Sequence, residues 1–412
     1  MKINIDYIAR VEGEASVKFD LKDGKLGNLK LNIWEPPRFF EGFLVGRKYD
    51  EVPDIVSRIC GICPVSHMTT SINAIERAIG FEPSSEIKNI RNIMALSQIA
   101  ASHIVHVYSL ALPDYHGLDM LKGLDKEIKR LLRLKEAVNG ITALFGGRAL
   151  HPVSMVAGGF TKVPSRDEIG RLISGLKAVK NDAIDTVKMV SELVYPGLEG
   201  DVEYAALVAE DEYAVNDGLI TTASGLKAGV DRYYTIFKEK EVSYANAKKT
   251  VLRGKKPVMV GALARLNIKA AMLHPEAARV AEMTGFSGQS KNPFHNIVAQ
   301  AIEIVHCILK CIDLLEGLSL KDYFMKVSLR EGSGAAMTEA PRGLLYHEYR
   351  LNRRGIIEKA NLVTPTAYNF LGIEETLKKL INGNIDKPAD ELSLLCEMLV
   401  RAYDPCFSCS VH

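Results

Sequence analysis

The chain lacks the features that mark nucleic-acid-binding, membrane and exported proteins. Its 52 Lys and Arg residues nearly balance its 50 Asp and Glu residues, and a net charge of +2 gives no electrostatic footprint for nucleic acid. No uninterrupted apolar run approaches the roughly 20 residues that span a bilayer. Charges also fill the N-terminus, where a signal peptide needs an apolar core. We therefore expect no membrane span, and either a location in the cytoplasm or export on the signal of another protein.

Other absent features exclude further classes of protein. The sequence has no G-x-G-x-x-G or P-loop motif for a nucleotide, no internal repeat and no low-complexity linker. Its seven cysteines are too few and too unevenly placed for a disulfide scaffold. With 47% hydrophobic and 25% charged residues, the composition is that of a globular protein. We expect one domain over residues 1–412.

Hydrophobic periodicity predicts a mainly α (α+β) fold, in which a large helical body surrounds a buried site and small antiparallel sheets lie at its periphery. Alternating residues around a Gly turn at 22–25 predict a β-hairpin within 1–35. A helical core follows over 64–318, with a second hairpin at 343–364 and a cysteine-rich tail at 402–412. The long helices are expected at 86–112, 165–194 (opened by a capping box), 294–318 and 388–401.

Two Cys-x-x-Cys pairs stand near opposite ends of the chain, Cys60-Gly-Ile-Cys63 and Cys406-Phe-Ser-Cys409. Thiolates at i and i+3 can bind one metal from one turn of chain, and two such pairs form a tetrathiolate site if the fold joins them. A structural zinc site is one interpretation, although zinc ribbons close short loops and these pairs lie about 340 residues apart. The remaining cysteines lie in apolar helical segments, where a buried thiol behaves as a small hydrophobe: Cys307, Cys311 and Cys396.

The residues around the two pairs carry a family resemblance. The first pair reads R-I-C-G-I-C-P-V-S-H from Arg58 to His67, and the second reads D-P-C-F-S-C-S-V-H from Asp404 to His412. This doubled pattern resembles the large subunit of [NiFe] hydrogenases. Further elements similar to those of the family follow in the same order at 10–13, 38–47, 146–159, 292–296, 339–343 and 362–366.

The resemblance implies the [NiFe]-hydrogenase large-subunit fold and a Ni–Fe centre held by all four cysteines. In this scheme Cys60 and Cys406 are terminal nickel ligands, while Cys63 and Cys409 bridge nickel to an iron that carries carbonyl and cyanide ligands, Fe(CO)(CN)2. Bridging sulfur suits two soft metal ions at once. The implied reaction is the reversible heterolytic oxidation of H2 to protons and electrons.

The resemblance also implies catalytic roles for three residues. Cys406 is the first base for the proton, and Glu12 passes it onward, which needs a carboxylate of tuned pKa within hydrogen-bond reach. Arg342 lies over the metals against a cyanide, where an always-charged guanidinium suits an anionic ligand. From the residues alone, Glu12 also fits a surface glutamate at a strand end and Arg342 a surface ion pair.

Three further residues match the family's contacts to the cofactor. Thr366 is expected to donate to another cyanide, Asp404 to face Arg342, and His67 to donate to a bridging sulfur. The alternatives to these roles are that Asp404 only forms a turn and that His67 is a buried core histidine with its hydrogen bonds satisfied by other groups. One departure is Ser102, which stands where many relatives have an Asp before the helix histidine, although cytoplasmic members often lack it.

A second metal site is implied by Glu41, the backbone carbonyl of Leu362 and His412, usually occupied by magnesium with several waters. One carboxylate with waters suits that hard cation, whereas an imidazole is less typical, so the identity of the ion stays open. In the family, a maturation protease removes a C-terminal extension just after this histidine, once nickel chaperones have supplied the metal. We expect the same maturation here.

Electrons need a route out, because after the four site cysteines no set remains that could hold an iron–sulfur cluster. The resemblance therefore implies an iron–sulfur small subunit. The layout is most similar to sulfhydrogenase alpha subunits of the cytoplasmic multisubunit class, whose diaphorase partners pass electrons through flavin to NAD(P). Deazaflavin-coenzyme-reducing, heterodisulfide-reductase-linked and H2-sensing hydrogenases are alternatives. Retention of all four cysteines argues against the metal-free relative in respiratory complex I.

Overall fold

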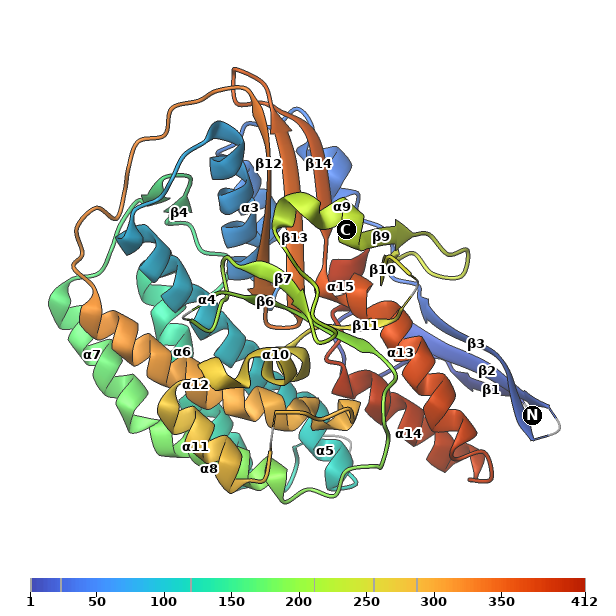
Figure 1. Cartoon of the computed structure of the whole chain (residues 1–412). Helices are drawn as coiled ribbons and strands as arrows, with labels where there is room; N and C mark the ends of the chain where they lie inside the picture. The colour runs from blue at the N-terminus through green and yellow to red at the C-terminus, as the bar shows by residue number, and fades with distance from the viewer. Residues whose placement is uncertain are drawn as a thin grey trace.

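Long helices pack side by side and form the body of the protein (Figure 1). The computed structural model describes residues 2–22, 24–118, 121–210, 212–254, 256–286 and 288–411. The body helices are α4 (Ser85–Val105), α6 (Asp125–Gly146), α7 (Arg166–Ala178), α8 (Lys180–Ser191), α10 (Ala262–Lys269), α11 (Pro275–Met283) and α12 (Asn296–Gly317). Buried along nearly its whole length, α12 lies at their centre and contacts α4, α7, α8, α10 and α11. The helix predicted at 294–318 is thus confirmed.

The helix predicted at 86–112 is confirmed, and it continues from α4 through a π-helical turn at His106–Ala111 into α5 (Leu112–Tyr115). Ser84 caps its start by accepting a hydrogen bond from the Ile87 N–H. By length and hydropathy, the 31-residue stretch Ser85–Tyr115 is the one candidate for a membrane span in the described part of the chain. However, 83% of its most apolar window is buried inside the protein, as in a core helix.

The single helix predicted at 165–194 is wrong, because two helices, α7 and α8, occupy this segment. Its start is confirmed: Ser165 accepts a hydrogen bond from the Glu168 N–H, and the Glu168 carboxylate accepts from the Ser165 N–H. At Val179 the backbone leaves the helical region, with φ −99° and ψ 3°, and its N–H bonds back to Leu176. The buried Val179 bends the chain so that both helices contact α12.

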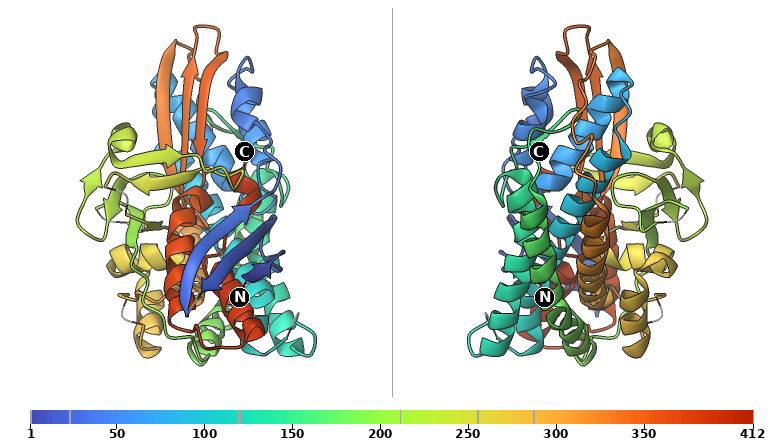
Figure 2. Two further views of the ribbon diagram at one scale, coloured as in Figure 1. Left: turned by 90° about the vertical axis from the view of Figure 1, so that its right-hand side faces the viewer. Right: turned by 90° about the vertical axis from the view of Figure 1, so that its left-hand side faces the viewer.

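The N-terminal sheet consists of the antiparallel strands β1 (Lys2–Ile5), β2 (Ala15–Lys22) and β3 (Lys25–Ile33) in that order. The predicted hairpin is confirmed in β2 and β3, while Asp23 of its turn lies outside the described residues. Figure 2 shows this sheet lying against α13 (Pro365–Asn382) and α14 (Ala389–Ala402), the latter being the helix predicted at 388–401. Between β1 and β2, Glu12 forms a β-bridge with Cys406 and so reaches the interior.

A second antiparallel sheet stands beside α3 (Pro64–Ile79) and is built from β12 (Gly332–Ala340), β13 (Gly343–Leu351) and β14 (Ile357–Val363). The predicted hairpin at 343–364 is β13 and β14, but the sequence analysis missed β12. Its segment GSGAAMTEA lacks the β-branched pattern of a strand. The strand forms here because glycine permits close approach to α3: a Cβ on Gly334 would lie 2.3 Å from both the Ala74 carbonyl oxygen and the Ala78 nitrogen.

Short elements complete the fold and surround the helical body. The remaining sheets have two to four strands, and β6 pairs with β7 antiparallel but with β11 in parallel, which was not predicted. The predicted fold class, mainly helical with small sheets, is confirmed. The elements are α1 (Phe40–Leu44), α2 (Val52–Ser57), β4 (Met155–Val156), β5 (Gly159–Phe160), β6 (Glu203–Val208), β7 (Leu219–Thr222), β8 (Lys227–Ala228), α9 (Tyr233–Ile236), β9 (Phe237–Lys240), β10 (Lys249–Leu252), β11 (Val258–Met259) and α15 (Phe407–Ser410).

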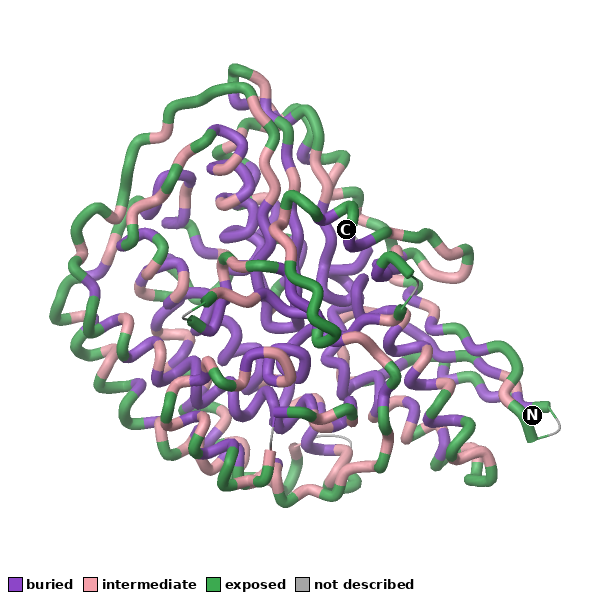
Figure 3. Tube along the Cα trace, in the orientation of Figure 1, coloured by how far each residue is buried: buried purple, intermediate pink, exposed green. Residues whose placement is uncertain are grey.

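The C-terminal tail runs into the interior instead of over the surface. Every residue from 399 to 411 is buried, and Figure 3 shows the end of the chain entering the buried centre of the molecule. A terminus held in this way has its backbone groups removed from water, which requires partners for them. Those partners come from the N-terminal region, from α12, from Thr366 and from Arg342, and they build the site described next.

Candidate metal centre

The four cysteines of the two pairs come together in the interior. The sulfurs of Cys60 and Cys406 lie 3.6 Å apart, and those of Cys63 and Cys409 lie 3.8 Å apart. The sulfurs of Cys406 and Cys409 also adjoin each other, and Cys60 and Cys63 are free thiols. All four residues are buried. The fold therefore brings the four predicted sulfurs together. They can act as metal ligands only when the Cys406–Cys409 pair is reduced.

Local backbone geometry fixes each pair. Cys63 precedes α3, whose first residue is a proline, and the N–H groups of Ile62 and Cys63 each approach the Cys60 sulfur at 3.3 Å. A hydrogen bond from the Cys63 thiol lowers the pKa of Cys60, although burial opposes it. In the second pair, the Cys406 N–H donates to Thr366 Oγ1 at 2.8 Å. Thr366 thus lies beside the site, and its hydroxyl keeps its own hydrogen for an acceptor.

Glu12 lies directly against the cysteine set. Cys406 Sγ lies 2.7 Å from Glu12 Oε2, so the thiol of the reduced pair donates to this oxygen, and the Glu12 carbonyl accepts from the Phe407 N–H at 2.8 Å. Burial raises the pKa of Glu12 above its ordinary value, against the opposing charge of Arg342. A carboxyl group with a raised pKa, within one hydrogen bond of a thiol, can exchange a proton with it. The alternative of a surface glutamate does not fit this position.

Arg342 occupies the turn between β12 and β13 and is 4% exposed. Its Nε donates to the backbone and side-chain oxygens of Asp404 at 2.8 and 3.0 Å, and its Nη2 lies 3.0 Å from the same carboxylate. Nη1 is also buried but has no hydrogen-bond partner within the described residues. A buried guanidinium donor without a protein acceptor is costly. It fits an anionic ligand beside the cysteines, as the sequence analysis predicts for this position.

Asp404 faces Arg342 as predicted and is held from two further sides. Gln300 donates to Asp404 Oδ2 at 2.9 Å, and His106 Nε2 lies 4.0 Å from Oδ1. Burial alone would raise the pKa of Asp404, but the charges of Arg342 and His106 outweigh it and bring the pKa below its ordinary value. Asp404 is therefore an ionised partner that fixes the guanidinium of Arg342.

The ring of His67 belongs to a buried chain of aromatic side chains. Its Nδ1 lies 3.3 Å from His347 Nε2, and His347 Nδ1 lies 2.8 Å from the Tyr349 hydroxyl. Contact between His67 and a bridging sulfur stays a prediction. At the departure noted in the sequence, Ser102 is buried, and its hydroxyl lacks a hydrogen-bond partner in the described part of the chain.

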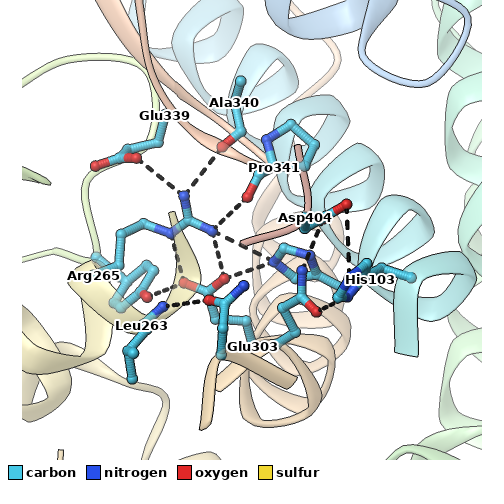
Figure 4. A network of polar contacts seen from close by, with 12 residues as sticks. His103, Leu263, Arg265, Glu303, Glu339, Ala340, Pro341 and Asp404 are labelled. Atoms are coloured by element: carbon cyan, nitrogen blue, oxygen red, sulfur yellow. Dashed lines mark hydrogen bonds and ion pairs between the residues drawn. The ribbon is translucent and has the colours of Figure 1, made fainter. Parts of the chain in front are cut away.

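A polar network beside this site was missed by the sequence analysis (Figure 4). Arg265 and Glu303 are both fully buried and form a double hydrogen bond with both distances 2.6 Å. His103 lies 2.8 Å from the same carboxylate. The available signal was the spacing of polar residues within the apolar helix α12, at positions 296, 300 and 303, which share one helix face.

Comparison with known proteins decides the family. The sequence model of nickel-dependent hydrogenases matches residues 38–130 and 226–412. The chain belongs to this family. It is 35% identical to the alpha subunit of sulfhydrogenase 1 of Pyrococcus furiosus, over all of this chain and 98% of that protein. It is also 30% identical to one subunit of the F420-non-reducing hydrogenase of Methanothermobacter marburgensis, over all of this chain and 95% of that protein.

Solved structures agree with the family assignment. An NAD+-reducing [NiFe]-hydrogenase matches with a TM-score of 0.92 and 26% identity, covering all of this chain and 99% of the other. The resemblance stated from the sequence is confirmed, and the protein is a [NiFe] hydrogenase catalytic subunit. The family implies a Ni–Fe centre. The four sulfurs, the adjoining carboxyl group of Glu12 and the buried Arg342 donor fit such a centre.

The hydrogenase fold also brings together part of the predicted second metal site. Glu41 Oε1 accepts a hydrogen bond from the Leu362 N–H at 3.0 Å, so these two residues adjoin. The prediction used the Leu362 carbonyl, which this contact does not involve. His412 lies outside the described residues, but the carbonyl of its neighbour Val411 accepts from the Arg38 N–H at 2.9 Å. The end of the chain therefore reaches the segment that carries Glu41.

Proposed function

We propose that this subunit catalyses the reversible heterolytic oxidation of H2 at a Ni–Fe centre whose iron carries one carbonyl and two cyanide ligands, Fe(CO)(CN)2. The observation that carries the proposal is the buried Nη1 of Arg342. This hydrogen-bond donor has no acceptor among the described residues and lies beside four convergent cysteine sulfurs. Thiolates are the ligands that soft metal ions prefer. A fixed cationic donor at the same place suits a small anionic ligand of the metal.

The cysteine sulfurs of both pairs would hold the centre, and Thr366 and Arg342 would donate hydrogen bonds to its anionic ligands. When bound, the centre supplies the Lewis acidity that polarises H2 toward heterolytic cleavage. The sulfur of Cys406 accepts the proton and delivers it to Glu12 Oε2 across the 2.7 Å hydrogen bond. Glu12 also interacts with the Ser408 hydroxyl, which in turn donates to Glu35 at 2.8 Å, so polar groups continue from Glu12 toward the half-buried Glu35.

We further propose that the first electron acceptor is an iron–sulfur small subunit, with flavin-containing diaphorase subunits passing electrons to NAD(P). Within the described residues, the cysteines outside the site lie buried in α12 and α14 and form no cluster-binding set. The likeness to an NAD+-reducing hydrogenase and to a sulfhydrogenase alpha subunit supports this acceptor. We also propose a cytoplasmic location and maturation by nickel chaperones and a C-terminal protease.

An infrared spectrum of the purified complex tests the proposed centre. We expect sharp bands from iron-bound carbonyl and cyanide, in a region where protein absorbs almost nothing, and we expect them to shift under H2. Their absence from a metal-replete sample with intact cysteines would overturn the proposal. Stoichiometric zinc in that sample would restore the structural zinc interpretation.

The pH dependence of turnover tests the role of Glu12. Burial raises its pKa above the ordinary glutamate value of 4.5. Because the ionised carboxylate is the form that accepts the proton from Cys406, lowering the pH through the raised pKa removes the acceptor. We expect H2 oxidation, measured as kcat with an artificial electron acceptor, to fall on an acid limb whose midpoint lies above pH 4.5. A midpoint at or below that value would contradict the role.

The second metal site is tested by removing its carboxylate. We propose that Glu41, Leu362 and His412 bind magnesium or another divalent ion, and a hard cation depends strongly on its few carboxylate ligands. Glu41→Ala is expected to lose this ion in elemental analysis while nickel and iron remain. Glu51→Ala, which changes an exposed glutamate nearby, serves as the control. Equal magnesium content in wild type and both variants would show that Glu41 does not bind the ion.

A further inference from the structure

One face of α12 carries three buried polar side chains: Asn296, Gln300 and Glu303. Their positions differ by four and then three residues, so they line up along the helix. The other residues of α12 that contact the core are mainly apolar. A buried polar stripe in such a helix is costly unless each group has partners, and all three side chains have them. These contacts lead, directly or through Arg265, to two segments that carry site residues.

Glu303 reaches the first segment through Arg265. The Arg265 guanidinium donates to the Glu303 carboxylate from Nε and Nη2. Its remaining hydrogens go to Glu339 Oε2 at 3.1 Å, to the Ala340 carbonyl at 3.1 Å and to the Pro341 carbonyl at 3.0 Å. Three of the five N–H donors of Arg265 therefore hold three consecutive residues that immediately precede Arg342 (Figure 4).

Gln300 and Asn296 reach the second segment directly. Gln300 donates to Asp404 Oδ2 at 2.9 Å, and Asn296 donates to the Ala402 carbonyl at 2.9 Å. Asp404 then holds Arg342 through its backbone and side-chain oxygens. One rigid helix thus sets the position of both Arg342 and the aspartate that pairs with it.

We propose that Arg265, anchored by Glu303, is a positioning residue that aims the Nη1 donor of Arg342 at the metal centre. The inference rests on the proposed function, because it concerns the ligand that Arg342 contacts. A pair that served stability alone would not need to be charged, because apolar side chains packed in the same place are often as stabilising as a buried ion pair. The hydrogen bonds from Arg265 to the Ala340 and Pro341 carbonyls fix the orientation of the backbone immediately before Arg342. Only the planar fork of arginine can make them together.

The test uses Arg265→Lys in the purified complex, with Arg91→Lys as a matched control. Arg91 forms an equally buried double hydrogen bond, to Glu76, with both distances 2.7 Å, and this pair lies on α3 and α4 away from the β12–β13 turn. Each substitution removes one buried double hydrogen bond between a guanidinium and a carboxylate, so we expect both variants to have lower thermal stability than the wild type. Only Arg265→Lys is expected to shift or broaden the cyanide infrared bands and to lower turnover about 10- to 100-fold with nickel and iron retained.

Amide hydrogen exchange of segment 339–343 gives a readout that does not depend on the metals. Exchange there should rise in Arg265→Lys and stay at the wild-type level in Arg91→Lys. If Arg265→Lys does not fold, Glu303→Gln removes the anchoring charge with the shape preserved and is expected to give the same band and exchange changes. Wild-type bands and exchange in the folded variant would overturn the inference. Absence of the bands from the wild-type complex would instead overturn the proposed function.

Discussion

Replacing Glu12 with Gln is expected to lower H2 oxidation by roughly 10²- to 10⁴-fold, the range that a positioned general acid–base group contributes. The amide preserves the shape of the side chain but cannot take up and release the proton that Cys406 delivers across 2.7 Å. Nickel and iron content should stay at the wild-type level, because the substitution keeps the shape of the side chain and all four cysteine sulfurs remain in place. Turnover, elemental analysis and the infrared spectrum measure these three quantities together.

Glu14→Gln is the matched control for this prediction. Glu14 lies two residues further along the same segment, and its N–H donates to Glu35 at 3.1 Å, so the substitution changes the same charge in the same region. Its carboxylate is not the acceptor of the Cys406 thiol. We expect near wild-type turnover from Glu14→Gln. Full turnover from Glu12→Gln would remove Glu12 from the proton route and leave Cys406 without its adjoining acceptor.

Elements with strong local signals were predictable from the sequence, and those that depend on distant contacts were not. The capping box at Ser165 and the apolar spacing of α4 are local properties, and both are confirmed. Strand β12 carries two glycines in place of strand-forming residues, and its conformation depends on close packing against α3. The bend at Val179 depends on the fit of α7 and α8 to α12. Neither contact is visible in a window of neighbouring residues.

The site divides in the same way. The two Cys-x-x-Cys pairs are short motifs, so the four cysteines could be identified from the sequence, and resemblance added Glu12 and Arg342. The fold brings the cysteines and Glu12 into contact, and it places Arg342 near enough to interact electrostatically with Cys60, Cys63 and Glu12. Arg265 and Glu303 belong to no such motif, and their partners lie far away along the chain. Their significance follows only from which backbone carbonyls the guanidinium reaches, which is a property of the folded structure.

Cys409→Ser is expected to abolish activity and to leave the protein almost free of nickel. In the proposed centre this sulfur would bind both metals, and a hydroxyl, which is a poor ligand for soft metal ions, would remove a ligand from each. The sulfurs of Cys63 and Cys409 lie 3.8 Å apart, which places the altered side chain within the ligand set. Elemental analysis of the purified complex, together with an assay of H2 oxidation, checks the result.

Cys396→Ser separates loss of a ligand from the cost of a buried hydroxyl. Cys396 is fully buried in α14, and in the described residues it belongs to no group that could bind a metal. Its substitution is expected to cost about 1–3 kcal/mol of stability, because the hydroxyl loses its hydrogen bonds to water, while nickel content and turnover per nickel stay unchanged. Equal loss of nickel from both variants would mean that the C-terminal region from α14 onward fails to fold when either Cys396 or Cys409 is changed. Nickel retained in Cys409→Ser would exclude that sulfur as a bridge and leave a centre held by the remaining three.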